Sequence, residues 1–298
     1  MSKIGICIDP HITDRHRCRQ DNFLATSLSK LEYIAKQNDF VIVVGDLFHT
    51  SSNPTYIFYK VYELLNKYKG KFIAMPGNHD LLHNNLHTLE RTTIGSLALT
   101  GALRLEFDSF KIDKAEFQIS HVMKDLSKVP VDNENRKILL GHNYLEFPAA
   151  PKESLTKQEI YELNYNLVFL GHDHQPHEEE LIGDSTLIRM GSLTRIDTQF
   201  YNRERKIYYY QLDSNTLDYE KKEVPHEASS KIFTEEAFNR IGKIKEDITF
   251  VKIGDVLAKF KKKSNGSNSL NDKLEKIATQ KEIDYIRMLH EMNNVRYF

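Results

Sequence analysis

Short motifs in the first two thirds of the sequence carry side chains that bind metal ions or transfer protons. They are Asp9-Pro10-His11, Gly45-Asp46-Leu47-Phe48-His49, Gly77-Asn78-His79-Asp80, Gly141-His142 and Gly171-His172-Asp173-His174. If His49 and His79 are kept for catalysis, two aspartates, one asparagine and four histidines remain as metal ligands. Oxygen and imidazole donors together suit manganese, iron or zinc, whereas an all-oxygen set would suit magnesium. Seven ligands, one of them a bridging carboxylate, are enough for two divalent ions, which polarise a phosphoryl oxygen and activate water.

Each motif follows a short apolar run that is typical of a buried β-strand. These runs are Lys3 to Ile8, Phe40 to Val44, Lys71 to Met75, Lys137 to Leu140 and Leu167 to Leu170. In α/β sheets, functional groups cluster where loops leave the strand ends. Glycines next to the motif residues allow tight turns and a close approach of the backbone. We therefore expect the motif side chains to meet at one edge of the core.

Helical patterns separate several of these predicted strands. They cover Asn22 to Lys36, Pro54 to Tyr68 and Lys157 to Leu163. Strands that alternate with helices predict βαβ units around a parallel sheet. A β-prone stretch covers residues 103 to 122, a hairpin is expected to turn at Gly183-Asp184, and residues 207 to 224 are again β-rich. The simplest fold is a mixed α/β sandwich.

Length and composition exclude several classes of protein. The 298 residues are 40% hydrophobic and 28% charged, which is ordinary for a globular protein. A net charge of -1 gives no basic field of the kind that marks many nucleic-acid-binding domains. The two cysteines, Cys7 and Cys18, form no disulfide framework, so we expect a reducing, cytoplasmic location. No stretch approaches the roughly 18 apolar residues of a membrane span, so we expect no membrane contact.

The composition changes after about residue 225. We expect a catalytic domain over residues 1–225 and a C-terminal capping or partner-binding region over 226–298, with a linker near 264–269. A predicted helix from Leu270 to Met292 carries an apolar stripe. This stripe has two interpretations: it covers the protein's own core, or it docks on a partner.

Taken in order, the motifs resemble the signature of the calcineurin-like metallophosphoesterases over roughly residues 1 to 200. The resemblance implies an α+β sandwich of two mixed β-sheets flanked by helices, with a small C-terminal α/β or helical appendage. The segment from Gly45 to Pro54 further resembles the SbcD-like nuclease subunits of double-strand-break repair complexes. Gly191-Ser192-Leu193-Thr194-Arg195 resembles the Gly-Ser segment that closes the catalytic domain of the family.

The resemblance also implies a role for each motif residue. The first metal would be held by Asp9, His11 and His174, and the second by Asn78, His142 and His172, with Asp46 as the bridge. His79 would be the catalytic histidine, His49 a phosphate-contacting histidine, and Asp80 a residue that orients His79. His121 is an alternative to His142. Four other histidines near the motifs are interpreted as solvent-facing: His16, His83, His87 and His177.

Three functions are consistent with these residues. The first is a manganese-dependent DNA exonuclease or endonuclease of double-strand-break repair. The second is the same two-metal chemistry on a nucleotide, a cyclic nucleotide or a phosphoprotein. The third is a scaffold that has lost catalysis, which is disfavoured because no ligand or catalytic histidine is missing.

For the nuclease, the resemblance implies DNA as substrate and a coiled-coil, SbcC-like ATPase as partner at the C-terminal helix. A homodimer is a further candidate assembly.

Overall fold

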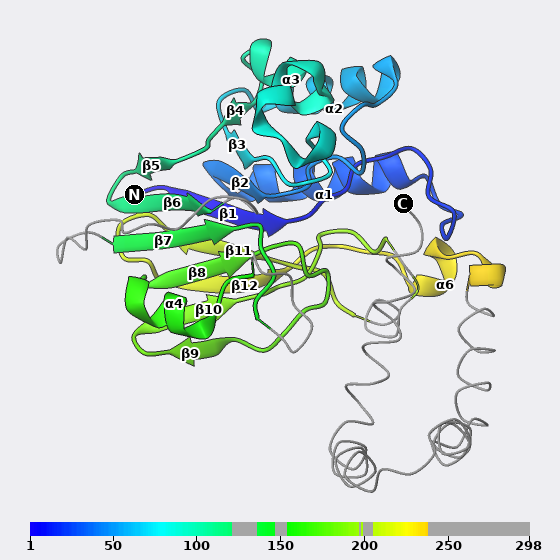
Figure 1. Cartoon of the computed structure of the whole chain (residues 1–298). Coiled ribbons are helices and arrows are strands. Elements are labelled where there is room, and N and C mark those ends of the chain that lie inside the picture. Colours follow the sequence, from blue (N-terminus) through cyan, green and yellow to red (C-terminus); the bar gives the residue numbers. More distant parts are fainter. Residues whose placement is uncertain (121–135, 147–153, 197, 199–204, 238–298) are drawn as a thin grey trace, which may run out of the picture. The chain divides into compact units, whose positions relative to one another are not determined.

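The computed structural model describes residues 1–120, 136–146, 154–196, 198 and 205–237 (Figure 1). These residues belong to one compact unit, Met1–Phe238. The predicted linker and the predicted C-terminal helix lie outside the described residues. The domain boundary near residue 225 therefore stays a prediction.

The first sheet has the strand order β12-β11-β1-β2-β3-β4. Its strands are β1 (Lys3–Ile8), β2 (Phe40–Val44), β3 (Phe72–Met75), β4 (Arg104–Leu105), β11 (Tyr208–Asp213) and β12 (Tyr219–Glu223). Strands β1 to β4 are parallel, whereas β11 is antiparallel to β1 and β12 is antiparallel to β11. The sheet is therefore mixed.

Three helices pack on the outer face of the first sheet (Figure 1). They are α1 (Phe23–Gln37), α2 (Thr55–Lys67) and α3 (Thr93–Leu99). Asn22 starts α1 by accepting a hydrogen bond from the amide of Ala25, which satisfies one of the free amides at a helix start. Two short 3-10 helices lead from β3 towards α3: η1 (Leu82–Asn84) and η2 (Leu86–Arg91).

The second sheet has the order β5-β6-β7-β8-β10-β9 and is also mixed. Its strands are β5 (Ser109–Ile112), β6 (Ala115–Ser120), β7 (Arg136–Gly141), β8 (Leu167–Leu170), β9 (Glu180–Ile182) and β10 (Ser185–Ile188). The four central strands are parallel, and β5 and β9 run antiparallel at the two edges. Helix α4 (Lys157–Leu163) packs on its outer face through Ile160, and a short helix α6 (Ser229–Ile232) follows β12. The predicted hairpin is present as β9 and β10, with Gly183 at φ +59°.

The main core lies between the two sheets. Side chains alternate across a strand, so Ile4, Ile6 and Ile8 of β1 point into this layer and Cys7 points towards the helices. The second sheet supplies Phe117 of β6 among the side chains that fill the same layer. Both faces of β1 and β2 are thus covered, which is why these strands are continuous apolar runs. The predicted α/β sandwich of two mixed sheets flanked by helices is confirmed.

Among the described residues, no helix combines the length and the apolar character that crossing a membrane would require.

Candidate metal centre

The parallel strands of both sheets end at the same edge of the sandwich, and the loops at this edge carry the predicted site residues (Figure 1). The loops after β1, β2 and β3 belong to the first sheet, and those after β7 and β8 belong to the second. The amide of His172 donates to Asp9 Oδ2 at 2.7 Å, so the two sheets are joined directly at the site. The residues brought together are Asp9, His11, Asp46, His49, Asn78, His79, Asp80, His142, His172 and His174.

One cluster consists of Asp9, His11 and His174. The Nε2 atoms of His11 and His174 are 2.9 Å apart, and the two rings are nearly perpendicular at 81°. Two imidazole nitrogens that bind one metal ion at about 2.0–2.1 Å each come to lie roughly 3 Å apart. The spacing of these rings therefore fits a shared divalent ion.

A second cluster surrounds Nε2 of His142. This atom is 3.1 Å from Asn78 Oδ1, 3.2 Å from His172 Nδ1 and 3.3 Å from Asp46 Oδ2. Oxygen and imidazole donors thus converge on one point, as they would around a second ion. His142 itself is fully buried.

Asp46 lies between the two clusters. Its Oδ2 is 3.3 Å from His142 Nε2 and 3.7 Å from His11 Nε2, and it is buried without a hydrogen-bond partner among the described residues. Its Oδ1 accepts a hydrogen bond of 2.8 Å from the amide of His79. A buried carboxylate oxygen with no partner is costly unless a cation or a donor faces it. The position of Oδ2 therefore fits a carboxylate that bridges two ions.

The backbone of these loops is bent to aim the ligands inwards. Asp9, His11, Asp46 and His172 all have positive φ, at 49°, 46°, 28° and 79°. Residues other than glycine adopt this region at a cost of about 1–2 kcal/mol each. Such strain concentrates at functional sites, where the surrounding structure holds it in place.

Two glycines allow the loops to approach one another. A Cβ atom at Gly45 would lie 1.7 Å from His142 Nδ1, and one at Gly77 would lie 2.1 Å from Asp46 Oδ1. Neither position has space for a side chain. The expected role of these glycines in close backbone approach is confirmed.

Burial and neighbouring charges set the protonation of the site. Burial, with the nearby His174, lowers the pKa of His11 well below its ordinary value. Burial, with the charge of His142, lowers the pKa of His172 to about 3. Both rings are therefore neutral near pH 7, which is the form that binds a metal ion.

The positive charge of His142 and the negative charge of Asp46 each favour the charged form of the other residue. Burial alone would lower the pKa of His142, but the carboxylates of Asp46 and Asp9 raise it well above its ordinary value. Burial alone would raise the pKa of Asp46, but His142 holds it well below its usual range. A cation at Asp46 would take over the role of the proton on His142, since metal binding releases protons from its ligands.

His79 and His49 lie on the first sheet's side of the centre. Their rings stack at 5.5 Å with an angle of 21° between the planes, and the His79 ring is 5.1 Å from that of His11. The Nδ1 atom of His79 lies 2.8 Å from the carbonyl oxygen of His49, so an Nδ1–H donates there and Nε2 remains for the substrate. Burial and nearby His16 lower the pKa of His49 to about 4.

Asp80 makes a different contact from the expected one. Its carboxylate accepts hydrogen bonds from the amides of Leu47, Phe48 and Gly77 at 2.8–3.0 Å. The His79 ring is oriented by the His49 carbonyl group instead. Burial and the charge of Asp46 raise the pKa of Asp80 to about 7, although three backbone donors act in the opposite direction. Asp80 thus ties the Asp46 loop to the Asn78 loop.

Comparison with known families identifies this arrangement. The family model for calcineurin-like phosphoesterases matches residues 3–176, which is more than half of the chain. The chain belongs to the calcineurin-like phosphoesterase family. It is therefore a metal-dependent phosphoesterase of a family that uses two divalent ions. The two clusters described above are two of three groups of described side chains close enough to hold an ion, and the third consists of His11, His49 and His79.

Solved structures of low sequence identity match the same chain. One is described as the crystal structure of TT1561 of Thermus thermophilus, with 14% identity and a TM-score of 0.47, covering 75% of this chain and 99% of the other. Another is described as a novel archaeal phosphodiesterase, with 16% identity and a TM-score of 0.39, covering 74% of this chain and 99% of the other. The search of curated proteins gives no match.

Within this calcineurin-like centre, the interpretation of His16 as solvent-facing is wrong, because its side chain is half-buried. The ring of His16 lies 5.3 Å from that of His49 and extends the histidine cluster towards the surface. The available signal was its position in the loop after β1, shared with His11.

His83 and His87 are exposed, as expected, whereas the Nε2 atom of His177 lies 2.7 Å from Asp173 Oδ2. His121, the alternative to His142, lies outside the described residues.

Proposed function

We propose that this calcineurin-like phosphoesterase is a manganese-dependent DNA nuclease that cleaves phosphodiester bonds at a two-metal site. The observation that carries the metal-pair part of the proposal is the position of Asp46 Oδ2 between the two histidine clusters. Asp9, His11 and His174 would hold one ion, and Asn78, His142 and His172 would hold the other. Mixed oxygen and nitrogen donors suit manganese, with iron and zinc as alternatives. When bound, such a metal pair polarises the phosphoryl group and supplies an activated water molecule.

The protein's own groups would then handle the leaving oxygen. His79 is half-buried and its ring is fixed through Nδ1, so Nε2 is the atom that would carry a proton to the leaving group. His49 stacks on His79, and its neutral ring at pH 7 would donate a hydrogen bond to a phosphate oxygen. Positioned acid catalysis of this kind typically contributes about 10²–10⁴ in rate.

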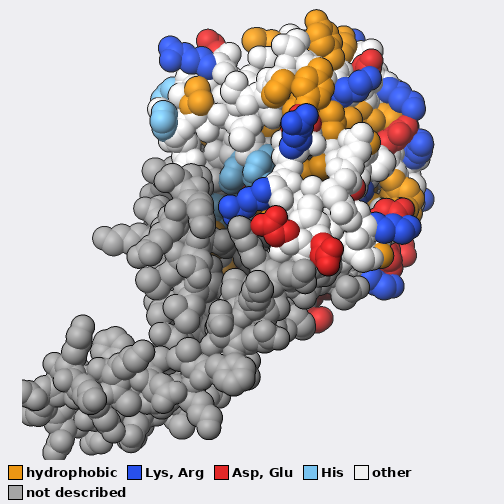
Figure 2. Space-filling view, turned by 90° about the vertical axis from the view of Figure 1, so that its right-hand side faces the viewer, with side chains coloured by type: hydrophobic (Ala, Val, Ile, Leu, Met, Phe, Trp, Pro, Cys, Tyr) orange, Lys and Arg blue, Asp and Glu red, His pale blue; other side chains and the backbone are white. Residues whose placement is uncertain are grey.

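Two observations favour DNA over a small phosphoester. The segment Gly45 to Pro54, which carries Asp46 and His49, resembles that of the SbcD-like nucleases. The centre also lies at an edge of the sandwich where His49, His79 and His174 are only partly buried. Figure 2 shows histidine side chains at the surface of this face with a basic side chain beside them. A partly open edge with half-buried imidazoles can receive a phosphate within a long chain.

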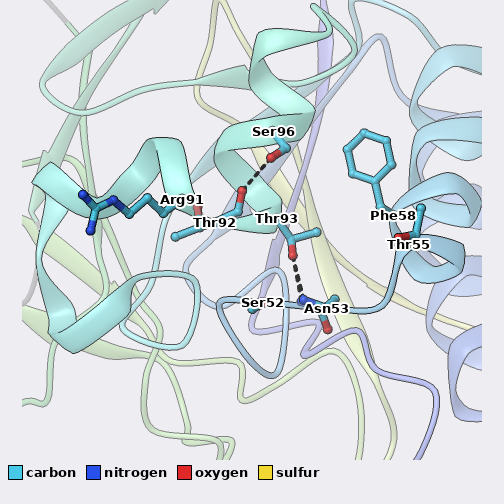
Figure 3. Close-up of a pocket in the computed structure, with 8 residues that line it drawn as sticks. All are labelled: Ser52, Asn53, Thr55, Phe58, Arg91, Thr92, Thr93 and Ser96. Carbon is cyan, nitrogen blue, oxygen red and sulfur yellow. Dashed lines mark hydrogen bonds between the residues drawn. The ribbon is translucent and has the colours of Figure 1, made fainter.

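A separate surface pocket lies between the loop before α2 and the start of α3 (Figure 3). Its lining is mostly small and polar, with Asn53 and Thr93 joined by a hydrogen bond of 2.9 Å from the Asn53 amide. None of the predicted metal ligands lines it. We therefore assign the chemistry to the histidine-rich edge and give this pocket no part in it.

The test is an assay with purified full-length protein and Mn²⁺. Single-stranded DNA, duplex DNA and a bis-aryl phosphodiester are offered in parallel, each with and without a chelator. The proposal expects metal-dependent cleavage of at least one DNA substrate together with the aryl diester. Cleavage of the aryl diester alone would favour a small natural substrate and would overturn the nuclease assignment. Chelator-resistant cleavage would overturn the metal assignment.

A further inference from the structure

The segment Gly191–Arg195, which begins three residues after the end of β10, lies beside the metal centre without contributing a ligand to it. The side chains of Ser192, Leu193, Thr194 and Arg195 are at most 2% exposed. Short polar segments are rarely buried so fully unless their polar groups are bonded. The hydrogen-bond partners of these backbone and side-chain groups lie in the loops that carry predicted metal ligands and in the elements behind the segment.

On one side, the segment is bonded to the loop after β1, which carries Asp9 and His11, two of the predicted ligands of the first ion. The amide of Leu193 donates to the carbonyl oxygen of Ile8 at 2.7 Å, and the Thr194 hydroxyl donates to the carbonyl oxygen of Pro10 at 2.8 Å. Ile8 precedes Asp9 in the chain, and Pro10 stands between Asp9 and His11. These two bonds therefore fix the backbone on either side of Asp9.

The same segment also reaches the loop that carries His174. The amide of Ser192 donates to the carbonyl oxygen of His174 at 3.3 Å. A Cβ atom at Gly191, where φ is +74°, would lie 2.6 Å from that oxygen. Only glycine allows this approach, so the segment links the β1 loop of one sheet to the β8 loop of the other.

On its other side, the side chains of one lysine and two arginines hold the segment. Lys30 of α1, which is 2% exposed, donates to the carbonyl oxygen of Leu193 at 3.0 Å. Arg205 donates to the carbonyl oxygens of Ser192 and Thr194 at 2.6 and 3.1 Å. Arg19 donates to the carbonyl oxygen of Arg195 at 2.6 Å. The two arginines are charged, and hydrogen bonds from charged donors are roughly twice as strong as neutral ones. Burial and the nearby Arg19 lower the pKa of Lys30 well below its ordinary value, so Lys30 holds the segment through its buried hydrogen bond.

This support matters because the ligand loop is strained. Asp9 and His11 both have positive φ, and Pro10 separates them. A loop with two such residues relaxes unless neighbouring groups determine its conformation. The bonds to the carbonyl groups of Ile8 and Pro10 supply that constraint.

We propose that Gly191–Arg195 is a brace for the first metal ion, with Thr194 and Lys30 as positioning residues. The brace holds Asp9, His11 and His174 at the spacing that one divalent ion requires. Removing the Thr194 hydroxyl lets the Pro10 carbonyl group move, and Asp9 and His11 lose their alignment. This inference rests on the ligand assignment under Proposed function, but it makes no use of the substrate.

The test is a calorimetric titration of metal-free protein with Mn²⁺. In a His142→Ala background the protein should retain only the first ion. In this background Thr194→Val should weaken binding of the first ion by about 10–100-fold, which is the usual effect of losing a group that orients a metal ligand. In a His174→Ala background only the second ion is retained, and the same change should weaken its binding clearly less than that of the first ion, because Thr194 bonds the carbonyl group between Asp9 and His11 and, among the described residues, contacts no ligand loop of the second ion. The unsubstituted chain, which should bind two ions, tests the ligand assignment separately.

Matched variants separate positioning from general stability. Thr194→Ser keeps the hydroxyl group and should restore the affinity for the first ion. Thr93→Val removes the hydroxyl group of another buried threonine, which accepts a bond from the Asn53 amide, and should leave both ions unaffected. Lys30→Met keeps an apolar stem of similar length and should weaken the first ion selectively, so that the inference can still be tested if Thr194→Val fails to fold.

Two results would overturn the brace. One is an equal loss of affinity in the two backgrounds for Thr194→Val or Lys30→Met, which would mean that the segment supports the fold as a whole. The other is an unchanged affinity for the first ion in both variants, or no recovery with Thr194→Ser.

Discussion

The two sheets contribute different chemistry to one site. The loops of the first sheet supply the oxygen donors Asp9, Asp46 and Asn78 together with His11, whereas the loops of the second sheet supply only imidazoles. Each cluster combines residues from both sheets, so neither sheet could bind an ion with its full set of ligands. The metal centre therefore depends on the packing of the sandwich, and a bound ion should in turn stabilise that packing.

The two sides also differ in how their loops are held. On the first sheet, Asp9, His11 and Asp46 have strained backbones and are fixed by glycines, by Asp80 and by the segment 191–195. On the second sheet, His172 alone among the predicted ligands has a positive φ. Substitutions on the first sheet's side should therefore have the larger effects on the metal pair.

The largest effect is expected from Asp46→Asn. This change removes the negative charge from the atom that lies between both clusters, so both ions should bind more weakly and hydrolysis should become undetectable. Metal content and turnover of a bis-aryl phosphodiester measure the two effects. A protein that kept full activity after this change would rule out a bridging role for Asp46.

A comparison of His174→Ala with His79→Ala separates ligand from catalyst. His174→Ala removes a ligand supplied by the second sheet, so the protein should bind about one ion in place of two. His79→Ala should keep both ions and lose about 10²–10⁴ in turnover, as expected for a lost general acid. Loss of metal from His79→Ala, or unchanged turnover, would show that His79 does not have this role.

A smaller effect is expected in the pH dependence of stability. The pKa of His49 is about 4 in the folded protein, lowered by burial and by His16, against about 6.5 when unfolded. The unfolded state binds more protons between these values, so stability rises with pH across this window and is lost as pH falls from 6.5 towards 4. The lowered pKa values of His11 and His172 add to this slope and the raised pKa of Asp80 opposes it, so variants measured by denaturant unfolding of the metal-free protein at several pH values isolate the part that comes from His49. The slope should decrease in His49→Gln and stay the same in His83→Gln, whose histidine is exposed. Equal slopes in the two variants would contradict the burial of a neutral His49.

The smallest effect on chemistry is expected from truncation after Lys263. We propose that the helix predicted from Leu270 to Met292 docks on a coiled-coil ATPase through its apolar stripe. All proposed ligands precede residue 175, so the shortened chain should still hydrolyse a bis-aryl phosphodiester. It should lose capture of the ATPase or efficient action on long duplex DNA. A large fall in melting temperature with loss of model-substrate activity would show that the stripe packs on the protein's own core.

The strands and the ligand loops could be predicted because local sequence determines them. The runs before Asp9, Asp46 and His172 are apolar, stop abruptly and end in polar motifs, and parallel strands bring such ends to one edge. The helices between Leu82 and Leu99 were not predicted, because short 3-10 turns have no extended apolar period.

Contacts made across the fold could not be predicted. Lys30 lies in a helix that was predicted, but its bond to the Leu193 carbonyl group joins residues 163 positions apart. Asp80 was expected to orient the ring of the adjacent His79, yet it accepts hydrogen bonds from the backbone amides of Leu47 and Phe48 in the loop after β2 and of Gly77 in its own loop. A sequence motif identifies which side chains carry the chemistry, whereas the groups that hold them depend on tertiary packing.

The most direct test of the two-metal centre is a crystal structure of the protein grown with Mn²⁺ and measured at the manganese absorption edge. Two anomalous peaks about 3.5–4 Å apart are expected, the usual separation in two-metal sites. One should lie among Asp9, His11 and His174, the other among Asn78, His142 and His172, with a carboxylate oxygen of Asp46 bound to both. A single peak, or a peak among His11, His49 and His79, the third group able to hold an ion, would contradict a metal pair shared between the two sheets.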